Sequence, residues 1–504
     1  MATMCAWFIP CDADGENGPR VRLVPFLLAF LLIYTAWAWA GLRPGFHRVG
    51  VATAGLLLAA VAWEGRGAAV RAAFRDPVFQ LGLAFLAYLA VQWLNAGRTQ
   101  YYDVGYRRWT YTNPPWPNWP SAFARADAAQ MLAWFFPAWA IAVAIRSGLA
   151  SARVLRRLLM LVAINAGLLA TFGLIQLASG TDAIFWVRPL KTHFFASFAY
   201  GNHAAPYFVL VGAWACGLLF REIFDVRNPH RAALGRLRHP GRVALLVPAA
   251  VLCLAGANMG FSRAGVILAG VLAVFVVVYG WLRAWRLLSP AGRVNGAAVS
   301  LAVVGSLYFL VAGFGEGGIR KEFTLRAAEP GVLRTLWDRI DLELGGRPQY
   351  ARAAAAIWSA HPWFGVGGWG YKYLVADHVP ATSWPALEKR GWANVHVDFL
   401  QFLAEFGAVG MALLLGALAV LARDACVLRR GRHDACWTLA VAGLALTVLF
   451  SGIDIPFRCP AILYAWTALL AALPTLCLAS ERRGSDVLPA APAAEAALPG
   501  RTEP

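Results

Sequence analysis

The chain has 504 residues, of which 59% are hydrophobic and only 14% are charged, and its mean hydropathy is +0.56. Soluble domains carry about 25% charged residues, so this composition excludes an ordinary soluble protein and indicates a membrane protein. The formal net charge of +18 does not call for a nucleic-acid partner, because an excess of Arg in cytoplasmic loops explains much of it and suits anionic lipid headgroups.

Apolar runs of about 17 to 25 residues recur between Val24 and Leu478, and each is long enough to cross a bilayer. A backbone in hydrocarbon must satisfy its own polar groups, so we expect these runs to be helices. The predicted fold class is an all-α polytopic membrane protein with about 12 transmembrane helices and one large outward-facing loop that contains short helices. The predicted spans are 24–40, 49–63, 78–94, 128–145, 158–178, 204–220, 243–259, 264–282, 297–314, 407–422, 437–452 and 459–478.

Every second connection between these spans is rich in Arg, and by the positive-inside rule these connections are cytoplasmic. They are 64–77, 146–157, 221–242, 283–296 and 423–436. The alternate connections then face outward, and both termini are cytoplasmic. These outward connections include 95–127, 180–203 and 315–406.

The predicted organisation has five parts. A cytoplasmic N-terminus spans 1–23, and a bundle of about nine transmembrane helices spans 24–314. A large outward loop at 315–406 is the expected seat of chemistry, and a bundle of about three helices follows at 407–478. The tail at 479–504 is rich in Ala and Pro, and we expect it to be disordered and cytoplasmic.

The first polar motif in chain order is FAYGNHAA at 198–205, where a predicted span begins on its outward side. Asn202 and His203 are candidates for binding sugar hydroxyls or a phosphate. The alternative for Asn202 is a helix cap, to which its side chain is well suited.

The second motif is GFSRAG at 260–265, which sets Arg263 among small residues at the outer end of a span. Small residues allow a ligand or another helix to approach closely, and a guanidinium makes two-pronged bonds to phosphate oxygens. The alternative is an interfacial anchor whose charge reaches toward the headgroups.

The third motif lies in the large loop, where Arg347 and Pro348 precede an Ala-rich stretch that suits a helix. The segment HPWFGVGGWGY follows at 361–371, and its first residue, His361, is a further candidate for substrate binding. The glycines permit a close backbone approach to a ligand. The aromatic side chains suit either sugar stacking or the membrane interface.

The fourth motif is NVHVDFLQFLAEFG at 394–407, where the loop meets the next span. Helical spacing places Asp398, Gln401 and Glu405 near one face. His396 lies at the start of this helix, where an imidazole can act as a general base near neutral pH. The alternative is a polar surface histidine with no chemical role.

In their order and sidedness these motifs resemble the O-antigen ligase and polymerase family of bacterial envelope glycosyltransferases. The resemblance runs from about Ser197 to Gly410 and rests on Ser-Arg-Ala-Gly, on the loop Arg, on His-Pro-x-x-Gly-x-Gly and on the His-containing helix that ends in Glu-x-Gly. One departure concerns the last motif, in which family members commonly have Asn after the His, whereas this chain has Val397.

The resemblance implies an inner-membrane enzyme that moves a glycan from an undecaprenyl-diphosphate carrier to an acceptor hydroxyl on the periplasmic side. The acceptor would be lipid A core, a glycan or a protein, and the reaction would be inverting, with no required metal or other cofactor. His396 would accept the hydroxyl proton, while Arg263 and Arg347 would stabilise the diphosphate leaving group. Glu405 would orient His396 or hold the acceptor, and a groove between helices would house the polyprenyl tail.

Two other functions remain open from the residues alone. A transporter or facilitator of a small solute fits the many spans, although coupled transport needs ionisable residues within the membrane, and the predicted spans contain almost none. A non-catalytic scaffold for envelope assembly is the third possibility. The sequence does not distinguish a ligase from a polymerase.

Overall fold

The computed structural model describes most of the chain between residues 23 and 485. The predicted span 297–314, the first part of the large loop and both chain ends lie outside the described residues. Within 23–485 the description omits 66, 98, 104, 106–107, 150, 191–192, 225–238, 261, 288–346, 381–393 and 428–434.

Long helices coincide with all eleven predicted spans that fall within the described residues, so the all-α polytopic membrane fold is confirmed. Eight helices in this part of the chain are long and apolar enough to cross a membrane, and three further apolar helices are shorter. The long helices are α2 (Leu23–Trp37), α3 (Pro44–Glu64), α5 (Pro77–Leu94), α6 (Arg125–Val143), α7 (Ala152–Ala178), α8 (Gly201–Ile223), α10 (Pro240–Asn258), α11 (Arg263–Leu287), α18 (Asp398–Val427), α19 (Ala435–Phe450) and α20 (Pro460–Ser485).

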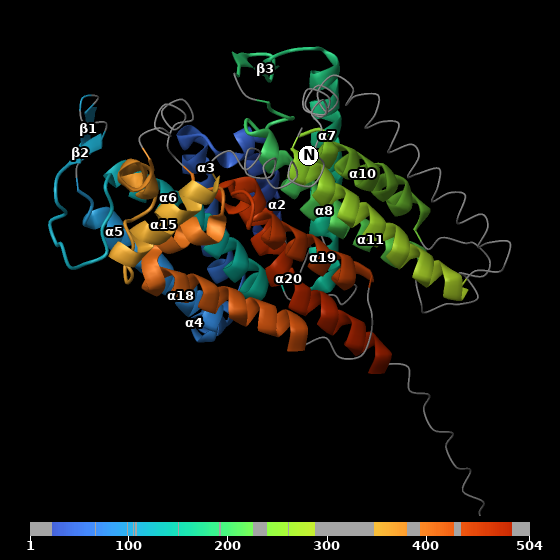
Figure 1. Ribbon diagram of the computed structural model, residues 1–504. Coiled ribbons are helices and arrows are strands. Elements are labelled where there is room, and N and C mark those ends of the chain that lie inside the picture. Colours follow the sequence, from blue (N-terminus) through green and yellow to red (C-terminus); the bar gives the residue numbers. More distant parts are fainter. Residues whose placement is uncertain are drawn as a thin grey trace, which may run out of the picture.

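Helix α8 lies inside the bundle and packs against α10, α11 and α19 (Figure 1). Its most apolar stretch is 89% buried, against 22% for α11. Small residues make this packing possible. A Cβ at Gly217 would lie 2.9 Å from the Cα of Cys436, and one at Gly443 would lie 2.7 Å from the Cβ of Ala213. Such close helix contacts are the usual way in which membrane helices associate.

Three of the five predicted cytoplasmic connections meet at one end of the bundle. Arg146, in the π-helical turn η2 (Ala144–Gly148), forms ion pairs with Asp76 at 2.5 Å and with Asp424 at 3.0 Å. These three residues come from the connections, or the ends of helices, around 64–77, 146–157 and 423–436. The short amphipathic helix α4 (Ala68–Arg75) belongs to the first of them. These three connections therefore lie together as the positive-inside rule predicts, while the side of the membrane stays a prediction.

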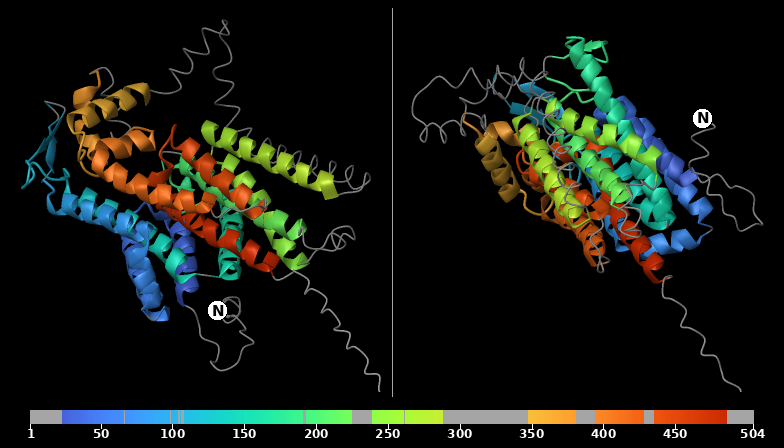
Figure 2. Two further views of the ribbon diagram at one scale, coloured as in Figure 1. Left: turned by 90° about the horizontal axis from the view of Figure 1, so that it is seen from below. Right: turned by 90° about the vertical axis from the view of Figure 1, so that its right-hand side faces the viewer.

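The opposite end of the bundle carries the short elements of the predicted outward loops (Figure 2). Helix α15 (Arg347–Ala360) buries Tyr350 and Ile357 against α16 (Tyr371–Leu374) and the start of α18. The large loop therefore has a small apolar core of its own. The remaining elements are η1 (Trp39–Gly41), the hairpin β1 (Thr99–Asp103) and β2 (Arg108–Tyr111), the hairpin β3 (Ala183–Ile184) and β4 (Arg188–Pro189), η3 (Val375–His378) and η5 (Pro456–Arg458).

Candidate active site

The glycine-rich turn at 361–371 forms backbone hydrogen bonds with α18 at the point where that helix is interrupted. Gly407 has φ 62° and ψ −171°, which interrupts the helix. The carbonyls of Ala404 and Glu405 lose their helical donors there and accept instead from Val366 N (3.0 Å) and Gly367 N (2.8 Å). Because buried backbone groups must be paired, this exchange is what permits a break at this depth.

The two amides after the break are paired in the same way. Ala408 N donates to Pro362 O at 2.8 Å, and Val409 N donates to Trp363 O at 3.0 Å. A Cβ at Gly365 would lie 2.5 Å from the backbone carbon of Glu405, so only glycine fits. Sequence analysis attributed these glycines to a close approach to a ligand. In the structure Gly365 approaches the backbone of α18, and Gly367 approaches the backbone of Ser121 and Ala122.

Glu405, next to the break in α18, is fully buried and forms an ion pair. Its carboxylate pairs with Arg458 in η5, and the two side chains are 0% and 1% exposed. Arg458 also lies over the rings of Trp369 and Phe402, at 4.7 and 4.8 Å from their centroids. Gln401 donates to the second carboxylate oxygen at 3.1 Å. In the described residues Glu405 forms no hydrogen bond or ion pair with His396, which contacts another carboxylate instead, and a role of Glu405 in holding the acceptor stays a prediction.

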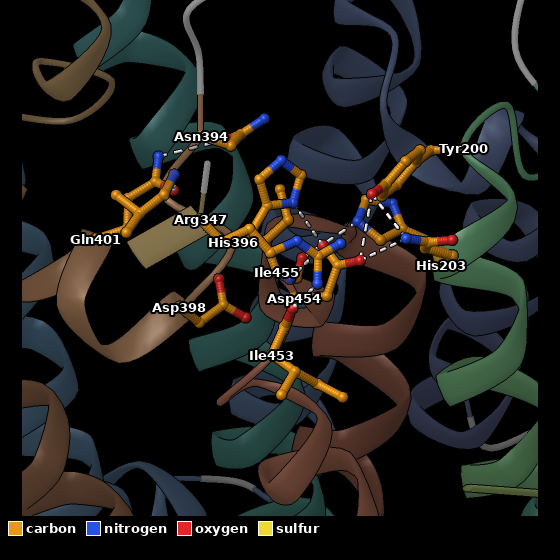
Figure 3. A network of polar contacts seen from close by, with 12 residues as sticks. Tyr200, His203, Arg347, Asn394, His396, Asp398, Gln401, Ile453, Asp454 and Ile455 are labelled. Atoms are coloured by element: carbon orange, nitrogen blue, oxygen red, sulfur yellow. Dashed lines mark hydrogen bonds and ion pairs between the residues drawn. The ribbon is translucent and has the colours of Figure 1, made fainter. Parts of the chain in front are cut away.

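That carboxylate is Asp454, in the turn between α19 and η5. His396 Nδ1 lies 3.2 Å from Asp454 Oδ1, which also accepts from Ile455 N at 2.9 Å. Asn202 Nδ2 donates to Asp454 Oδ2 at 2.6 Å, and the hydroxyl of Tyr200 donates to the same oxygen at 3.2 Å (Figure 3). One buried carboxylate thus joins the start of α8 to the residues just before α18.

The electrostatics of this group favour a charged Asp454. Burial alone would raise the pKa of its carboxyl, but the hydrogen bond and charge of His396, the charge of His203 and the Asn202 amide outweigh burial and hold the pKa at about 2. Burial and the Asp454 charge raise the pKa of the Tyr200 hydroxyl well above its ordinary value, so Tyr200 remains a donor.

His396 itself has a strained backbone. Its φ of 61° lies in the left-handed region, which costs a non-glycine residue on the order of 1–3 kcal/mol and is concentrated at functional sites. Its side chain is 25% exposed, in contrast to the 3% of Asp454. Figure 3 shows the second ring nitrogen directed away from Asp454. The imidazole is therefore held from one side and open on the other.

Two predicted residues of α8 belong to this group. Asn202 bonds to Asp454 and to the Tyr200 hydroxyl (2.8 Å), and α8 has no side-chain cap, so the capping alternative for Asn202 is wrong. His203 Nε2 lies 3.1 Å from the carbonyl of Ile455, and its ring packs edge-on against Tyr200. Both side chains help to hold the Asp454 turn in place.

Arg347 reaches the same turn from the large loop. As the first residue of α15, it donates from Nη1 to the carbonyl of Ile453 at 2.8 Å. Its charge also acts on Tyr200. The structure therefore brings together four sequence-predicted residues, namely Asn202, His203, Arg347 and His396.

The Arg263 motif packs against the start of α8. A Cβ at Gly260 would lie 2.5 Å from the carbonyl oxygen of Gly201, and Ser262 Oγ accepts from Gly265 N at 3.2 Å. Arg263 begins α11, so its backbone belongs to this contact, but its side chain lies outside the described part of the chain. The small residues of the motif serve the approach of a helix.

His361 lies apart from the Asp454 group. It is exposed on the turn after α15, and its carbonyl accepts from Gly365 N at 3.0 Å. Partial burial and the charge of His378 lower the pKa of its imidazole. Its observed contacts are those of the glycine-rich turn, and its role in substrate binding stays a prediction.

Sequence analysis missed Tyr200, Asp454 and Arg458. Asp454 and Arg458 lie in SGIDIPFR at 451–458, the short connection between the last two predicted spans. An Asp and an Arg so close together between apolar helices were a usable signal. Val397, at the position where the family commonly has Asn, packs into the apolar core around Tyr350 and Ile357.

An apolar groove leads away from the site along α18. Its volume is about 220 Å³, and α5, α6, α18 and α20 supply most of its lining. Asp398, Ser451 and Phe457 also line it, so the groove reaches the first turn of α18. Asp398 Oδ2 accepts from Phe457 N at 2.8 Å, whereas Oδ1 has no hydrogen-bond partner among the described residues.

A known protein family matches part of the chain. Residues 248–415 match the family described as O-antigen ligase, so the resemblance is confirmed over a segment that contains Arg263, Arg347 and His396. The match supports a multi-pass bacterial membrane protein of the O-antigen ligase or polymerase type, a glycosyltransferase class that acts in envelope polysaccharide synthesis. No curated protein matches the chain. Asp454, Arg458 and the start of α8 lie outside the matched segment.

Proposed function

We propose that this protein transfers a glycan from an undecaprenyl-diphosphate carrier to an acceptor hydroxyl at the periplasmic face of the inner membrane. The family match supports the class of enzyme. The observation that carries the proposal further is the imidazole of His396, held by Asp454 on one nitrogen and open on the other, with Arg347 bound to the same turn.

His396 serves as the general base. A carboxylate that accepts from Nδ1–H leaves Nε2 unprotonated, which is the arrangement that serine hydrolases use to prepare a histidine for proton transfer. Nε2 removes the proton of the acceptor hydroxyl as its oxygen attacks the anomeric carbon. The bond from that carbon to the phosphate oxygen breaks, and its electron pair leaves with the lipid diphosphate. Attack opposite the leaving group inverts the anomeric centre.

Cationic side chains stabilise the leaving diphosphate in a metal-independent reaction. Arg347 uses one Nη1 hydrogen bond to reach Ile453 O, and a guanidinium has five N–H donors, so others remain to bind phosphate oxygens. Arg263 supplies the second charge from the first turn of α11, whose motif packs against the start of α8. Charge that develops on the phosphate is then met by the Arg347 guanidinium, which its bond to Ile453 O holds at the Asp454 turn.

The polyprenyl tail occupies the apolar groove along α18. The groove has apolar side chains along most of its length and reaches Asp398 and Phe457, which adjoin the Asp454 turn in sequence or by hydrogen bond. A carrier whose diphosphate meets Arg347 would lay its first isoprene units there. The periplasmic sidedness, and the cytoplasmic position of both termini, rest on the Arg-rich connections at the opposite end of the bundle.

The alternative functions remain distinguishable. In a transporter, ionisable groups lie along the membrane path, whereas the described buried groups Asp398, Glu405, Asp454 and Arg458 gather at the end of the bundle that carries the large loop. A scaffold needs no oriented imidazole. Solute uptake into proteoliposomes that ignores His396 would favour a transporter, and wild-type glycan assembly by all point variants at the site would favour a scaffold.

The deciding experiment compares His396→Ala with His378→Ala. His378 is an exposed histidine of the same loop at the end of η3, so it is a matched control. In a strain that lacks the chromosomal copy, we expect H396A to insert normally and abolish surface glycan assembly, while H378A restores it. Normal surface glycan with H396A would overturn the proposal.

A further inference from the structure

Asp398 bonds to both ends of the short turn that carries Asp454. This turn, residues 451–457, begins just after α19 and runs into η5. Asp398 N donates to Ser451 O at 3.0 Å, and Asp398 Oδ2 accepts from Phe457 N at 2.8 Å. Along the chain, Asp454 lies midway between Ser451 and Phe457. The main chain and the side chain of Asp398 therefore hold the turn on either side of the Asp454 carboxylate.

The residue that holds the turn is also a near neighbour of the imidazole. Asp398 begins α18, and His396 stands just before that helix. His396 Nδ1 meets Asp454 Oδ1 at 3.2 Å, and Figure 3 shows Asp398 beside this pair. Along the turn, the contact of the imidazole lies between the two bonds that Asp398 makes. The segment 396–398 is thus joined to the turn before, at and after Asp454.

The backbone of His396 needs restraint from its neighbours. Its φ of 61° is disfavoured for a residue with a Cβ, so the surrounding contacts must hold it there. On the side before His396, Val395 is 0% exposed, and its N donates to Gln401 Oε1 at 3.0 Å. On the side after it, Asp398 is bound to the 451–457 turn. The strained residue therefore stands between two fixed points.

The hydrogen bond of Asp398 depends on one oxygen of its carboxylate. The residue is 2% exposed, and Oδ2 accepts from Phe457 N. Removal of that acceptor would leave a partly buried amide unpaired, which a turn can relieve only by moving. Oδ1 has no hydrogen-bond partner among the described residues. An asparagine has the same size and supplies the oxygen that Phe457 N needs, without the charge.

We propose that Asp398 is a positioning residue that fixes Asp454 relative to His396 through the turn that it holds. Its role is geometric, so the oxygen that accepts from Phe457 N is required and the negative charge is not. The inference rests on the proposed transferase function, because it concerns the general base of that reaction. A misplacement of about 1 Å can cost a reaction about 10²-fold in rate, so a loosened turn should lower kcat.

The first test compares variants in transfer from a purified lipid-linked oligosaccharide. Asp398→Ala removes the acceptor, so kcat should fall by about tenfold or more, while the KM for the acceptor substrate stays within about twofold. Asp398→Asn keeps the acceptor and should retain kcat within about threefold of the wild type. Size-exclusion profiles and thermal unfolding in detergent report whether each variant is folded.

Asp76→Ala is the matched control for a purely structural effect. Asp76 Oδ1 also accepts from a backbone amide, that of Val78, at 3.0 Å, but it lies at the opposite end of the bundle. We expect D76A to lower the melting temperature and to leave kcat within about twofold, because it is remote from the reacting groups. D398A should differ from it by losing kcat.

The second test asks whether Asp398 acts through Asp454. In Asp454→Asn the oriented carboxylate is already lost, so adding Asp398→Ala should lower kcat by less than about threefold more. Losses that multiply in the double variant would overturn the positioning role. A folded D398A with the wild-type kcat would also overturn it.

The asparagine variant keeps the inference testable if D398A does not fold. An active D398N supports the geometric role, and a folded D398N with a kcat lowered tenfold or more, to about the level expected for D398A, overturns it. With H396A inactive in the same assay, all of these failures leave the transferase intact. An active H396A would instead overturn the proposed general base, and this inference with it.

Discussion

His396 Nδ1 lies 3.2 Å from Asp454 Oδ1, although 58 residues separate the two in the chain. One residue precedes α18 and the other follows α19, so the contact exists only because the two helices return to the same end of the bundle. The pairing gives the imidazole a fixed orientation and a preferred tautomer. It is the feature on which the proposed chemistry most depends.

We expect Asp454→Asn to lower kcat by about 10²-fold or more, because general-base catalysis contributes about 10²–10⁴-fold and Asn no longer holds the productive tautomer. Asn keeps the size of Asp and an acceptor for Ile455 N, so the fold should persist. The measurement is transfer from a purified lipid-linked oligosaccharide, with size-exclusion profiles as the check on folding. A well-folded D454N with wild-type kcat would contradict the role of Asp454.

Asp454 should stay charged under ordinary assay conditions. The pKa of Asp454 is held at about 2, below its ordinary value of 3.8, so its stabilising contribution is present above pH 3.8 and is lost as the pH falls toward 2. The melting temperature of the wild type should therefore lose the Asp454 contribution only as the pH is lowered below 3.8, whereas D454N lacks that contribution at every pH. Equal melting temperatures for the wild type and D454N above pH 3.8 would contradict it.

Glu405→Gln should destabilise the protein by about 3–5 kcal/mol, because it leaves the buried guanidinium of Arg458 without its carboxylate. The double variant Glu405→Gln, Arg458→Met should recover part of this loss, since no charge is then stranded. Thermal unfolding in detergent measures both. Arg423→Ala is the control. It removes the ion pair between Arg423, whose side chain is 65% exposed, and Asp424, and it should change the melting temperature little.

The break in α18 should depend on Gly407. We expect Gly407→Ala to lower the melting temperature and to reduce activity, because a Cβ there meets the backbone of Trp363 and Gly365 at a positive φ. Gly416→Ala in the same helix is the matched control, since its Cβ would make ordinary contacts with Leu81 at 3.5–3.8 Å. Equal melting temperatures for the two variants would show that the backbone exchange at the break is not required.

The groove should matter for long carriers and not for short ones. Ala417→Trp fills the lining of the apolar groove, so we expect a KM increase for an undecaprenyl donor that is larger than for a donor with a short isoprenoid tail. Ala419→Trp points away on the exposed side of the same helix and is the control. If A417W affects both donors equally, the tail binds elsewhere.

The sequence determined a large part of the fold. Apolar runs long enough to span a bilayer predict helices because hydrocarbon offers the backbone no other partner, and all eleven runs within the described residues are helical. The Arg-rich connections predicted which helix ends lie together, as the Arg146 ion pairs with Asp76 and Asp424 show. The same reading also selected His396, Arg347, Asn202 and His203, which the structure places around one turn.

Only the tertiary structure decided which carboxylate serves His396. Helical spacing grouped Glu405 with Asp398 and Gln401 on one face of α18, but in the structure the Glu405 carboxylate pairs with Arg458 of η5. Asp454 reaches His396 from a connection that local sequence treats as a short link between spans. Spacing along one helix shows which residues share a face, whereas the element that packs against that face depends on the whole bundle.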